Sequence, residues 1–412
     1  MKMKKILSCF ISLLLLAFAF CTAIGAQEEE YSYDMEYYSK FKGQNITLYV
    51  YNWGEYISDG GEGSLNVEKE FEELTGINVE YTTFDSNESL YAKLKNGSAS
   101  YDVIIPSDYM ISRLAEEGML QKLDYSNIPN FEKYVDAEFK NPEYDPNNEY
   151  SVPYMWGTVG IIYNTKYVDE ADVTGWELLW NEKYAGKILM FDNSRDAFAI
   201  ALKKLGYSMN TNNTDEIREA ADELSAQADV IQAYVMDQIF DKMVEENAYI
   251  APYYAGDYLT MVEDNEDLAF FIPPEGTNLF TDAMCIPATS KKREAAEMFI
   301  NFMCEPVISA ANSDMIWYST PISAAKPLMD EELASSEIAY PSEELLANTE
   351  RYINLSDEAK QLMDELWISI VRSNELTPSF WIAVAVICVA SLAVVFRNMH
   401  IKKKRLEARK KY

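Results

Sequence analysis

From residue 45 onward, short apolar segments suited to β-strands alternate with segments whose apolar residues recur at helical spacing. The segment 45–51 (NITLYVY) alternates with period two, as half-buried strands do, and Val67, Phe71 and Leu74 follow at helical spacing. The segment 101–106 (YDVIIP) is a short, mainly apolar run, as in a buried parallel strand. This repeated alternation predicts parallel sheets covered by helices on both faces, which is an α/β fold.

The same rhythm resumes after residue 157. Strands are predicted at 157–164, 187–191, 248–254 and 268–273, and two helices are expected between about 215 and 246. Open sheets of this kind bind ligands beyond the carboxyl ends of their strands. Four polar or aromatic residues fall at such ends, so a binding site is expected there: Trp53, Ser107, Asn193 and Tyr254.

Both ends of the chain carry features of export and membrane attachment. Residues 1–26 have a Lys-containing start, an apolar stretch and small residues at the end, which predict a signal peptide. Residues 27–43 are acidic and tyrosine-rich, and we expect a mobile leader. Residues 379–396 carry no charge and are long enough for a transmembrane helix, and the basic tail 397–412 should stay cytoplasmic. The body is therefore expected on the extracytoplasmic face of the membrane.

Charge and histidine content narrow the functional classes. The chain has 67 Asp and Glu against 35 Lys and Arg, a net charge of −32. A body this acidic repels nucleic acid and attracts cations. The only histidine is His400, in the basic tail, so the body has no catalytic triad and no histidine-based metal site. We expect no enzyme, no metal and no cofactor, although chemistry by two carboxylates stays open.

Two smaller features each have two readings. Cys285 and Cys304 are the cysteines of the body, and we expect small buried residues, although a disulfide stays open. The segment 145–149 loosely suggests a calcium loop, but its spacing is poor and a turn is the expected structure.

Several segments resemble one known family. YNWGEY (51–56), YDVIIPSDYM (101–110), SVPYMWG (151–157) and KYAGKILMFDNSRDAF (183–198) are similar to segments of bacterial spermidine/putrescine-binding proteins. These have the type II periplasmic binding-protein fold and deliver ligand to ABC permease subunits. The resemblance covers most of 45–325 and keeps the order of the segments.

The resemblance implies two lobes with a ligand cleft between them. Lobe one is expected to contain 44–155 and 282–325, and lobe two 157–280 and 327–378. It also implies a set of ligand-binding residues, made of three acids, six aromatic residues and two polar residues. They are Glu55, Asp196 and Asp282; Trp53, Tyr56, Tyr109, Tyr254, Phe280 and Tyr318; and Ser107 and Asn193.

These residue types suit a polyamine, in which ammonium groups alternate with strips of CH2. Carboxylates bind the ammonium groups by charge-assisted hydrogen bonds, and aromatic faces line the strips and attract the cations. Asp282 is the strongest of the acids, because it lies in an apolar segment where a carboxylate needs a partner. Asp108 and Asp257 are second-line candidates. Ser107 is also expected to be a helix N-cap.

Three alternatives stay open at this point. The chain could be a receptor of the same fold for another small solute, a surface hydrolase that uses two carboxylates, or a membrane-tethered sensor or adhesion module. Asn193 stands where the family has Asp, Tyr254 and Phe280 stand where it often has Trp, and no residue in 348–354 matches a ligand-binding Gln of relatives. The choice between spermidine and putrescine therefore also stays open.

Overall fold

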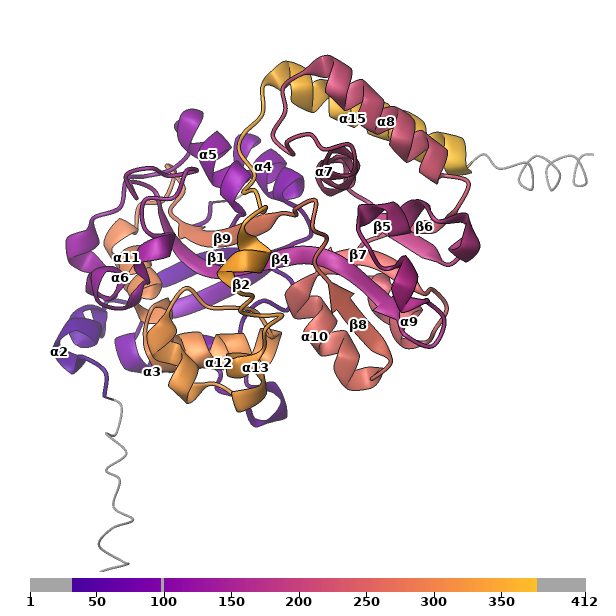
Figure 1. Ribbon diagram of the computed structural model, residues 1–412. Coiled ribbons are helices and arrows are strands. Elements are labelled where there is room, and N and C mark those ends of the chain that lie inside the picture. The colour runs from indigo at the N-terminus through magenta and orange to yellow at the C-terminus, as the bar shows by residue number, and fades with distance from the viewer. Residues whose placement is uncertain (1–31, 98–99, 376–412) are drawn as a thin grey trace, which may run out of the picture.

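The computed structural model describes residues 32–97 and 100–375 (Figure 1). Its strands are β1 (Thr47–Trp53), β2 (Asn78–Phe84), β3 (Val103–Ile104), β4 (Ser151–Asn164), β5 (Ile188–Phe191), β6 (Ile231–Val235), β7 (Ile250–Tyr254), β8 (Leu268–Phe271) and β9 (Leu279–Cys285). Strands and helices alternate along most of the chain. The α/β class predicted from the sequence is confirmed.

The helices fall before, between and after these strands. They are α2 (Met35–Tyr38), α3 (Val67–Thr75), α4 (Asn87–Lys95), α5 (Asp108–Glu116), α6 (Pro129–Tyr134), α7 (Ser194–Lys204), α8 (Thr214–Gln227), α9 (Ile239–Val244), α10 (Ala255–Asp264), α11 (Arg293–Met303), α12 (Pro306–Ile316), α13 (Glu331–Ser335), α14 (Glu343–Leu346) and α15 (Asp357–Glu375). A short 3-10 helix, η8, spans Ser323–Leu328.

The strands pair in the order β2-β1-β3-β9-β4-β7-β5-β6, and β8 pairs with β4. β1 is parallel to β2 and β3, and β5 is parallel to β6 and β7, as expected for strands joined by helices. β4 links the two groups, since Ser151–Thr158 pairs with β9 and Val159–Tyr163 pairs with β7. Figure 1 shows this long strand running from one half of the molecule to the other.

A third segment crosses between the halves after α14. Glu350 donates its N–H to the Thr277 carbonyl and accepts from the N–H of Leu279, so this segment lies beside the start of β9. Before it, α13 packs against η8, and η8 packs against α12. These contacts favour a final crossing after α13, whereas the sequence places it near 326. The limits of the two lobes stay a prediction.

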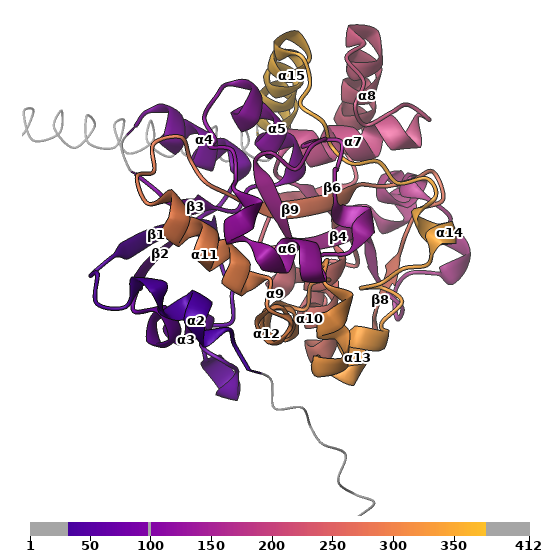
Figure 2. The same ribbon diagram turned by 90° about the vertical axis from the view of Figure 1, so that its left-hand side faces the viewer.

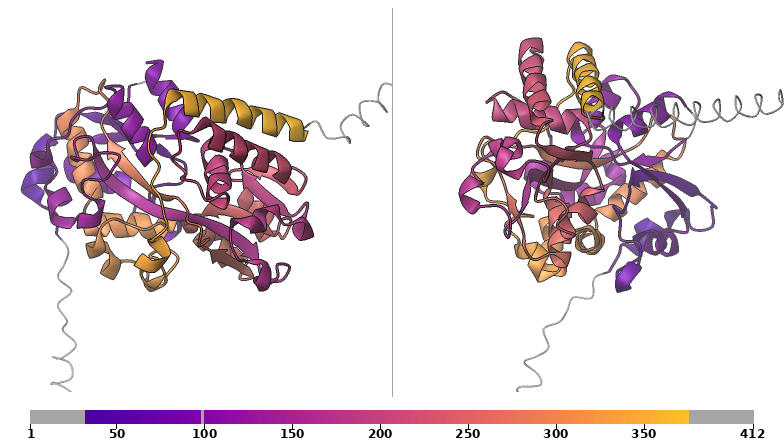
Figure 3. Two further views of the ribbon diagram at one scale, coloured as in Figure 1. Left: turned by 45° about the horizontal axis from the view of Figure 1, so that its top comes forward. Right: turned by 90° about the vertical axis from the view of Figure 1, so that its right-hand side faces the viewer.

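Helices α7, α8 and α15 form a layer on the half that contains β5 and β6. Figure 3 shows α15 beside α8, and α15 also contacts α7. β6 lies between α8 and α9, where the sequence suggested only two helices. That interpretation missed the strand. Ile231 and Val235, which pair with β5, are β-branched residues of the kind that favours strands.

The expectation of a mobile leader is wrong for the part that the structure describes. α2 lies beside α3 (Figure 2), and Tyr38 is 0% exposed. The Tyr38 hydroxyl donates to Glu305 Oε1 at 2.6 Å, and its ring lies edge-on to Phe302. Burying an aromatic ring that also has a polar partner anchors the segment to the body.

Other terminal and minor predictions have different outcomes. The predicted signal peptide (1–26) and transmembrane helix (379–396) lie outside the described residues. Within residues 32–97 and 100–375, no helix has both the length and the apolar character needed to cross a membrane. Cys285 and Cys304 are free and buried, which confirms their interpretation as small buried residues.

Candidate functional site

The site is organised around Asp282, in the middle of β9. Alternation along the strand puts Phe280 and Asp282 on one face and Thr281 on the other. Asp282 is 5% exposed, and its two oxygens accept from the Tyr56 hydroxyl at 2.8 Å and from Ser107 Oγ at 2.6 Å. Burial raises the pKa of the Asp282 carboxyl to about 6, and these two hydrogen bonds oppose that rise.

Ser107 occupies the N-cap position of α5, as the sequence predicts, but its side chain does not cap the helix. Its Oγ donates to Asp282 instead. Asn87, at the start of α4, holds Ser107 from both sides. The Asn87 amide donates to Ser107 Oγ, and the Ser107 N–H donates to Asn87 Oδ1, both at 3.1 Å. Asn87 is therefore a site residue that the sequence interpretation did not find.

An aromatic wall extends from Asp282. The rings of Tyr56 and Tyr318 lie 5.3 Å apart, those of Tyr318 and Phe280 6.0 Å, and those of Phe280 and Tyr254 5.4 Å. Four predicted site residues from distant parts of the chain thus form one continuous surface. Such a surface suits an alkyl chain that carries cationic groups.

Two glycines make room for this wall. A Cβ on Gly157 would lie 2.8 Å from Cζ of Phe280, and a Cβ on Gly256 would lie 2.1 Å from Cδ2 of Tyr318. Any larger residue at these positions would displace a ring, so the rings lie directly on the backbone of β4 and α10.

Asp257 adds a second carboxylate beside the wall. It lies in the first turn of α10, and its Oδ2 accepts from the Tyr318 hydroxyl at 2.9 Å. Burial raises the pKa of the Asp257 carboxyl to about 7, while the bond from Tyr318 opposes the rise. From the sequence, Asp257 is predicted only as a lower-ranked candidate for ligand binding.

A third carboxylate, Asp196, closes the far end of the wall in the first turn of α7. It is 7% exposed, and it accepts from the hydroxyls of Tyr254 at 2.9 Å and Tyr352 at 2.8 Å. The Asn193 amide, from the helix N-cap, donates to it at 2.6 Å. Tyr352 is 5% exposed, and the sequence interpretation missed it.

Two predicted residues, Trp53 and Glu55, stand apart from this cluster, and Tyr109 lies at its edge beside Tyr352. Trp53 is half-buried against Phe84, and its enclosed indole N–H has no partner within the described part of the chain. Tyr109 donates to Glu88 at 2.9 Å, and its ring lies 6.1 Å from that of Tyr352. Glu55 is exposed in a turn with φ of 50°. The structure therefore does not bring Glu55 to the Asp282 carboxylate.

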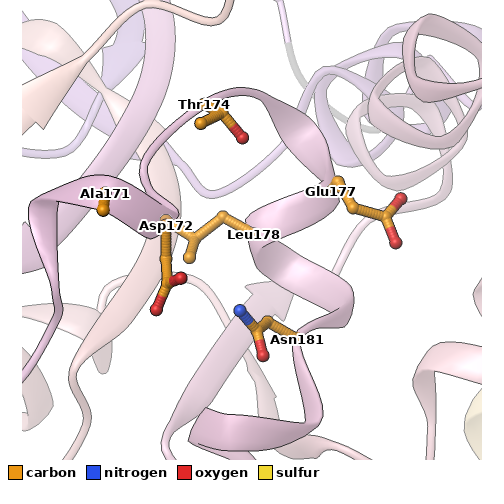
Figure 4. Close-up of a pocket in the computed structure, with 6 residues that line it drawn as sticks. All are labelled: Ala171, Asp172, Thr174, Glu177, Leu178 and Asn181. Atoms are coloured by element: carbon orange, nitrogen blue, oxygen red, sulfur yellow. The ribbon is translucent and has the colours of Figure 1, made fainter.

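A separate cavity of about 340 Å³ lies away from these residues (Figure 4). It is lined by Ala171, Asp172, Thr174, Glu177, Leu178 and Asn181. Asp172 already accepts from Lys183 at 2.7 Å and from the Tyr184 hydroxyl at 2.6 Å. None of the predicted site residues lines this cavity, so it is not the candidate site.

Comparison with known proteins defines the class of the chain. Residues 67–339 match the protein family described as bacterial extracellular solute-binding protein. The chain is therefore an extracytoplasmic solute-binding protein, a class of receptors and not of enzymes.

Closer relatives narrow the family. The chain is 36% identical to the spermidine/putrescine-binding periplasmic protein of Escherichia coli, over 74% of this chain and 86% of the relative. It is 33% identical to the putrescine-binding periplasmic protein SpuD of Pseudomonas aeruginosa, over 79% and 92%. A solved structure of the spermidine/putrescine ABC transporter substrate-binding protein PotD of Streptococcus pneumoniae superposes with a TM-score of 0.70 at 37% identity, covering 80% of this chain and 100% of that one. The chain belongs to the family of spermidine/putrescine-binding proteins of ABC transporters.

Proposed function

We propose that this chain captures a polyamine in the cleft around Asp282, closes on it, and delivers it to the permease of an ABC importer. The observation that carries the proposal is Asp282 itself. Within residues 32–97 and 100–375, this buried carboxylate has two hydroxyl donors and forms no ion pair, so its negative charge is not balanced by a basic side chain. An ammonium group balances that charge.

The rest of the site supplies the other requirements of a polyamine. Each ammonium–carboxylate hydrogen bond contributes about 1.5–3 kcal/mol, and each aromatic face near a cation about 0.5–2 kcal/mol. Asp282 and Asp257, with the rings of Tyr56, Tyr318 and Phe280, can therefore reach the roughly −8 kcal/mol of a micromolar complex.

Closure follows from the positions of the three crossing segments. β4, β9 and the segment at Glu350 join the two halves, and the site draws residues from both. Tyr56 and Ser107 precede β4 in the chain, whereas Asp196 and Tyr254 follow it. Rotation about these segments would open and close the cleft over a ligand.

We further propose that residues 379–396 anchor the receptor in the membrane, with 397–412 in the cytoplasm. The support is the uncharged length of the segment and the basic residues that follow it. A tether would keep the receptor close to its permease.

The test is a calorimetric titration of the full-length chain with putrescine, spermidine and a neutral oligosaccharide, at low and high salt. Binding of a polyamine that weakens as salt rises, with no heat from the oligosaccharide, is the expected result. Binding of the oligosaccharide alone would assign the chain to a different solute. Turnover of the oligosaccharide would instead identify a hydrolase.

A further inference from the structure

The three carboxylates along the wall differ in how their oxygens are occupied. Asp196 accepts three neutral donors: the hydroxyls of Tyr352 and Tyr254 and the amide of Asn193. A carboxylate has about four lone-pair positions in all. Its demand for hydrogen bonds is therefore nearly met within the protein.

Asn193 is uncharged, so Asp196 is the acid of this side-chain pair. The Oδ1 of Asn193 accepts the Asp196 N–H at 2.8 Å, which caps α7. Its amide N–H donates to the Asp196 carboxylate and occupies one of the acceptor positions of that acid. The ring of Tyr352 is fixed in turn by the Arg195 guanidinium, whose carbon lies 4.2 Å from the ring centroid. The donors of Asp196 are thus held in place.

The other two carboxylates, Asp282 and Asp257, accept fewer hydrogen bonds from the protein, so more of their acceptor positions can bind a ligand. Asp282 accepts one hydroxyl on each oxygen, and Asp257 accepts the Tyr318 hydroxyl on Oδ2. They are bound by neighbouring residues, because the rings of Tyr56 and Tyr318, whose hydroxyls donate to them, have centroids 5.3 Å apart. Burial is the main reason why the pKa of the Tyr318 hydroxyl is raised, and Asp257 and, to a smaller extent, Asp282 add to the rise.

We propose that the site is built for a short diamine, with one ammonium group on Asp282 and the other on Asp257, while Asp196 is a structural acid. This inference rests on the proposed polyamine function. A triamine would have to place its third ammonium group against Asp196 and displace donors that the fold holds there. Putrescine therefore binds at least as tightly as spermidine.

The test compares two variants that make the same change at two helix N-caps. Asn193→Asp replaces the amide beside Asp196 with a carboxylate, and Asp is as good an N-cap as Asn. Asn213→Asp is the matched control. Asn213 is the N-cap of α8, where its Oδ1 accepts the Asp215 N–H at 3.0 Å, and its amide donates to an acid three residues later, Glu216, at 3.1 Å. Neither residue of this control pair belongs to the candidate site.

Titrations of the full-length wild type and both variants with putrescine and spermidine give the readout. We expect Asn193→Asp to raise the ratio of spermidine to putrescine affinity about tenfold, and Asn213→Asp to leave it unchanged. A wild type that prefers spermidine tenfold, or equal ratios in the two variants, would overturn the inference while the polyamine function stands. Absence of binding of both amines to the wild type would overturn the function itself.

If Asn193→Asp folds poorly, Tyr352→Phe provides the second measurement. It removes one hydrogen-bond donor from Asp196 and keeps the ring, so the ratio of spermidine to putrescine affinity should rise about threefold. An unchanged ratio in Tyr352→Phe would contradict the idea that saturation of Asp196 excludes the third ammonium group.

Discussion

The candidate site and the loop before β4 each contain a buried aspartate, and the two have very different surroundings. Asp282 in the candidate site is 5% exposed and Asp145 in the loop is 3% exposed. Asp145 accepts the backbone N–H groups of Glu149, Tyr150 and Ser151 and the Ser151 hydroxyl, at 2.8–2.9 Å. Among the residues that the structure describes, two hydroxyl groups donate to the Asp282 carboxylate.

The difference separates structural acids from ligand-binding acids. Backbone N–H groups cannot turn away, so Asp145 is committed to organising its turn and has nothing left for a ligand. Hydroxyl groups rotate, and Tyr56 and Ser107 can reorient when a cation arrives. Burial alone therefore does not identify a binding residue, whereas the number of donors on the acid, together with their freedom to rotate, does. Asp196 has two hydroxyl donors but also a third donor, the Asn193 amide. The segment 145–149 contains a turn, as the sequence predicts, because the Asn148 N–H donates to the Asp145 carbonyl.

The largest expected effect is on ligand affinity in Asp282→Asn. Removing the charge from the central carboxylate should weaken polyamine binding about 100-fold, or ~2.7 kcal/mol, because a charge-assisted bond becomes a neutral one. Calorimetric titration measures the change. The thermal stability of the ligand-free protein should not fall, since a buried charge without a cation is removed. Retention of wild-type affinity would show that Asp282 does not bind the ligand.

Asp145→Asn should show the opposite pattern. The new amide N–H2 faces backbone donors, so at least one of them loses its acceptor, and the free energy of unfolding should fall by about 2 kcal/mol. Urea denaturation measures this loss. Ligand affinity of the folded variant should stay within about twofold of wild type. A large loss of affinity in Asp145→Asn would contradict the assignment of Asp145 as a structural acid.

The pH dependence of binding provides the next test. Burial raises the pKa of the Asp282 carboxyl to about 6 and that of Asp257 to about 7, and a cationic ligand prefers both groups ionised. Affinity should therefore fall about tenfold or more from pH 8 to pH 5.5, with a smaller fall in Asp282→Asn. The stability of the ligand-free protein should depend on pH in the opposite direction. The raised pKa of Asp282 favours folding below about pH 4, and this contribution is lost as pH rises through about 6. Affinity independent of pH would contradict the assignment of both acids.

Local patterns in the sequence predicted some parts of this site and could not predict others. Asp282 lies in an apolar run that demands a partner, and two of the predicted residues, Tyr56 and Ser107, supply it. Tyr352 could not be found in this way. It lies in a segment without regular secondary structure, and its bond to Asp196 joins residues 156 positions apart. Only the crossing of the chain at Glu350 brings them together.

Ser107 shows the same limit at a single residue. The sequence signal for an N-cap is correct about position, because α5 does begin after Ser107. It says nothing about which partner the hydroxyl takes, since a side chain with one proton can serve the helix or a distant carboxylate. Ser86 makes the other choice, because its Oγ accepts the Ser89 N–H at 3.2 Å and caps α4.

The smallest expected effect compares these two serines. Ser86→Ala should lower the free energy of unfolding by about 1 kcal/mol and leave ligand affinity unchanged, because it removes a cap. Ser107→Ala removes no cap, so it should weaken binding about threefold to tenfold with a smaller loss of stability. It should also shift the pH midpoint of binding upward, because Ser107 lowers the pKa of Asp282. Titration and denaturation of both variants separate the two roles. If Ser107→Ala lost stability like Ser86→Ala and kept its affinity and pH midpoint, the hydroxyl would be structural, and Asp282 would have one ligand-orienting donor fewer than the cleft geometry implies.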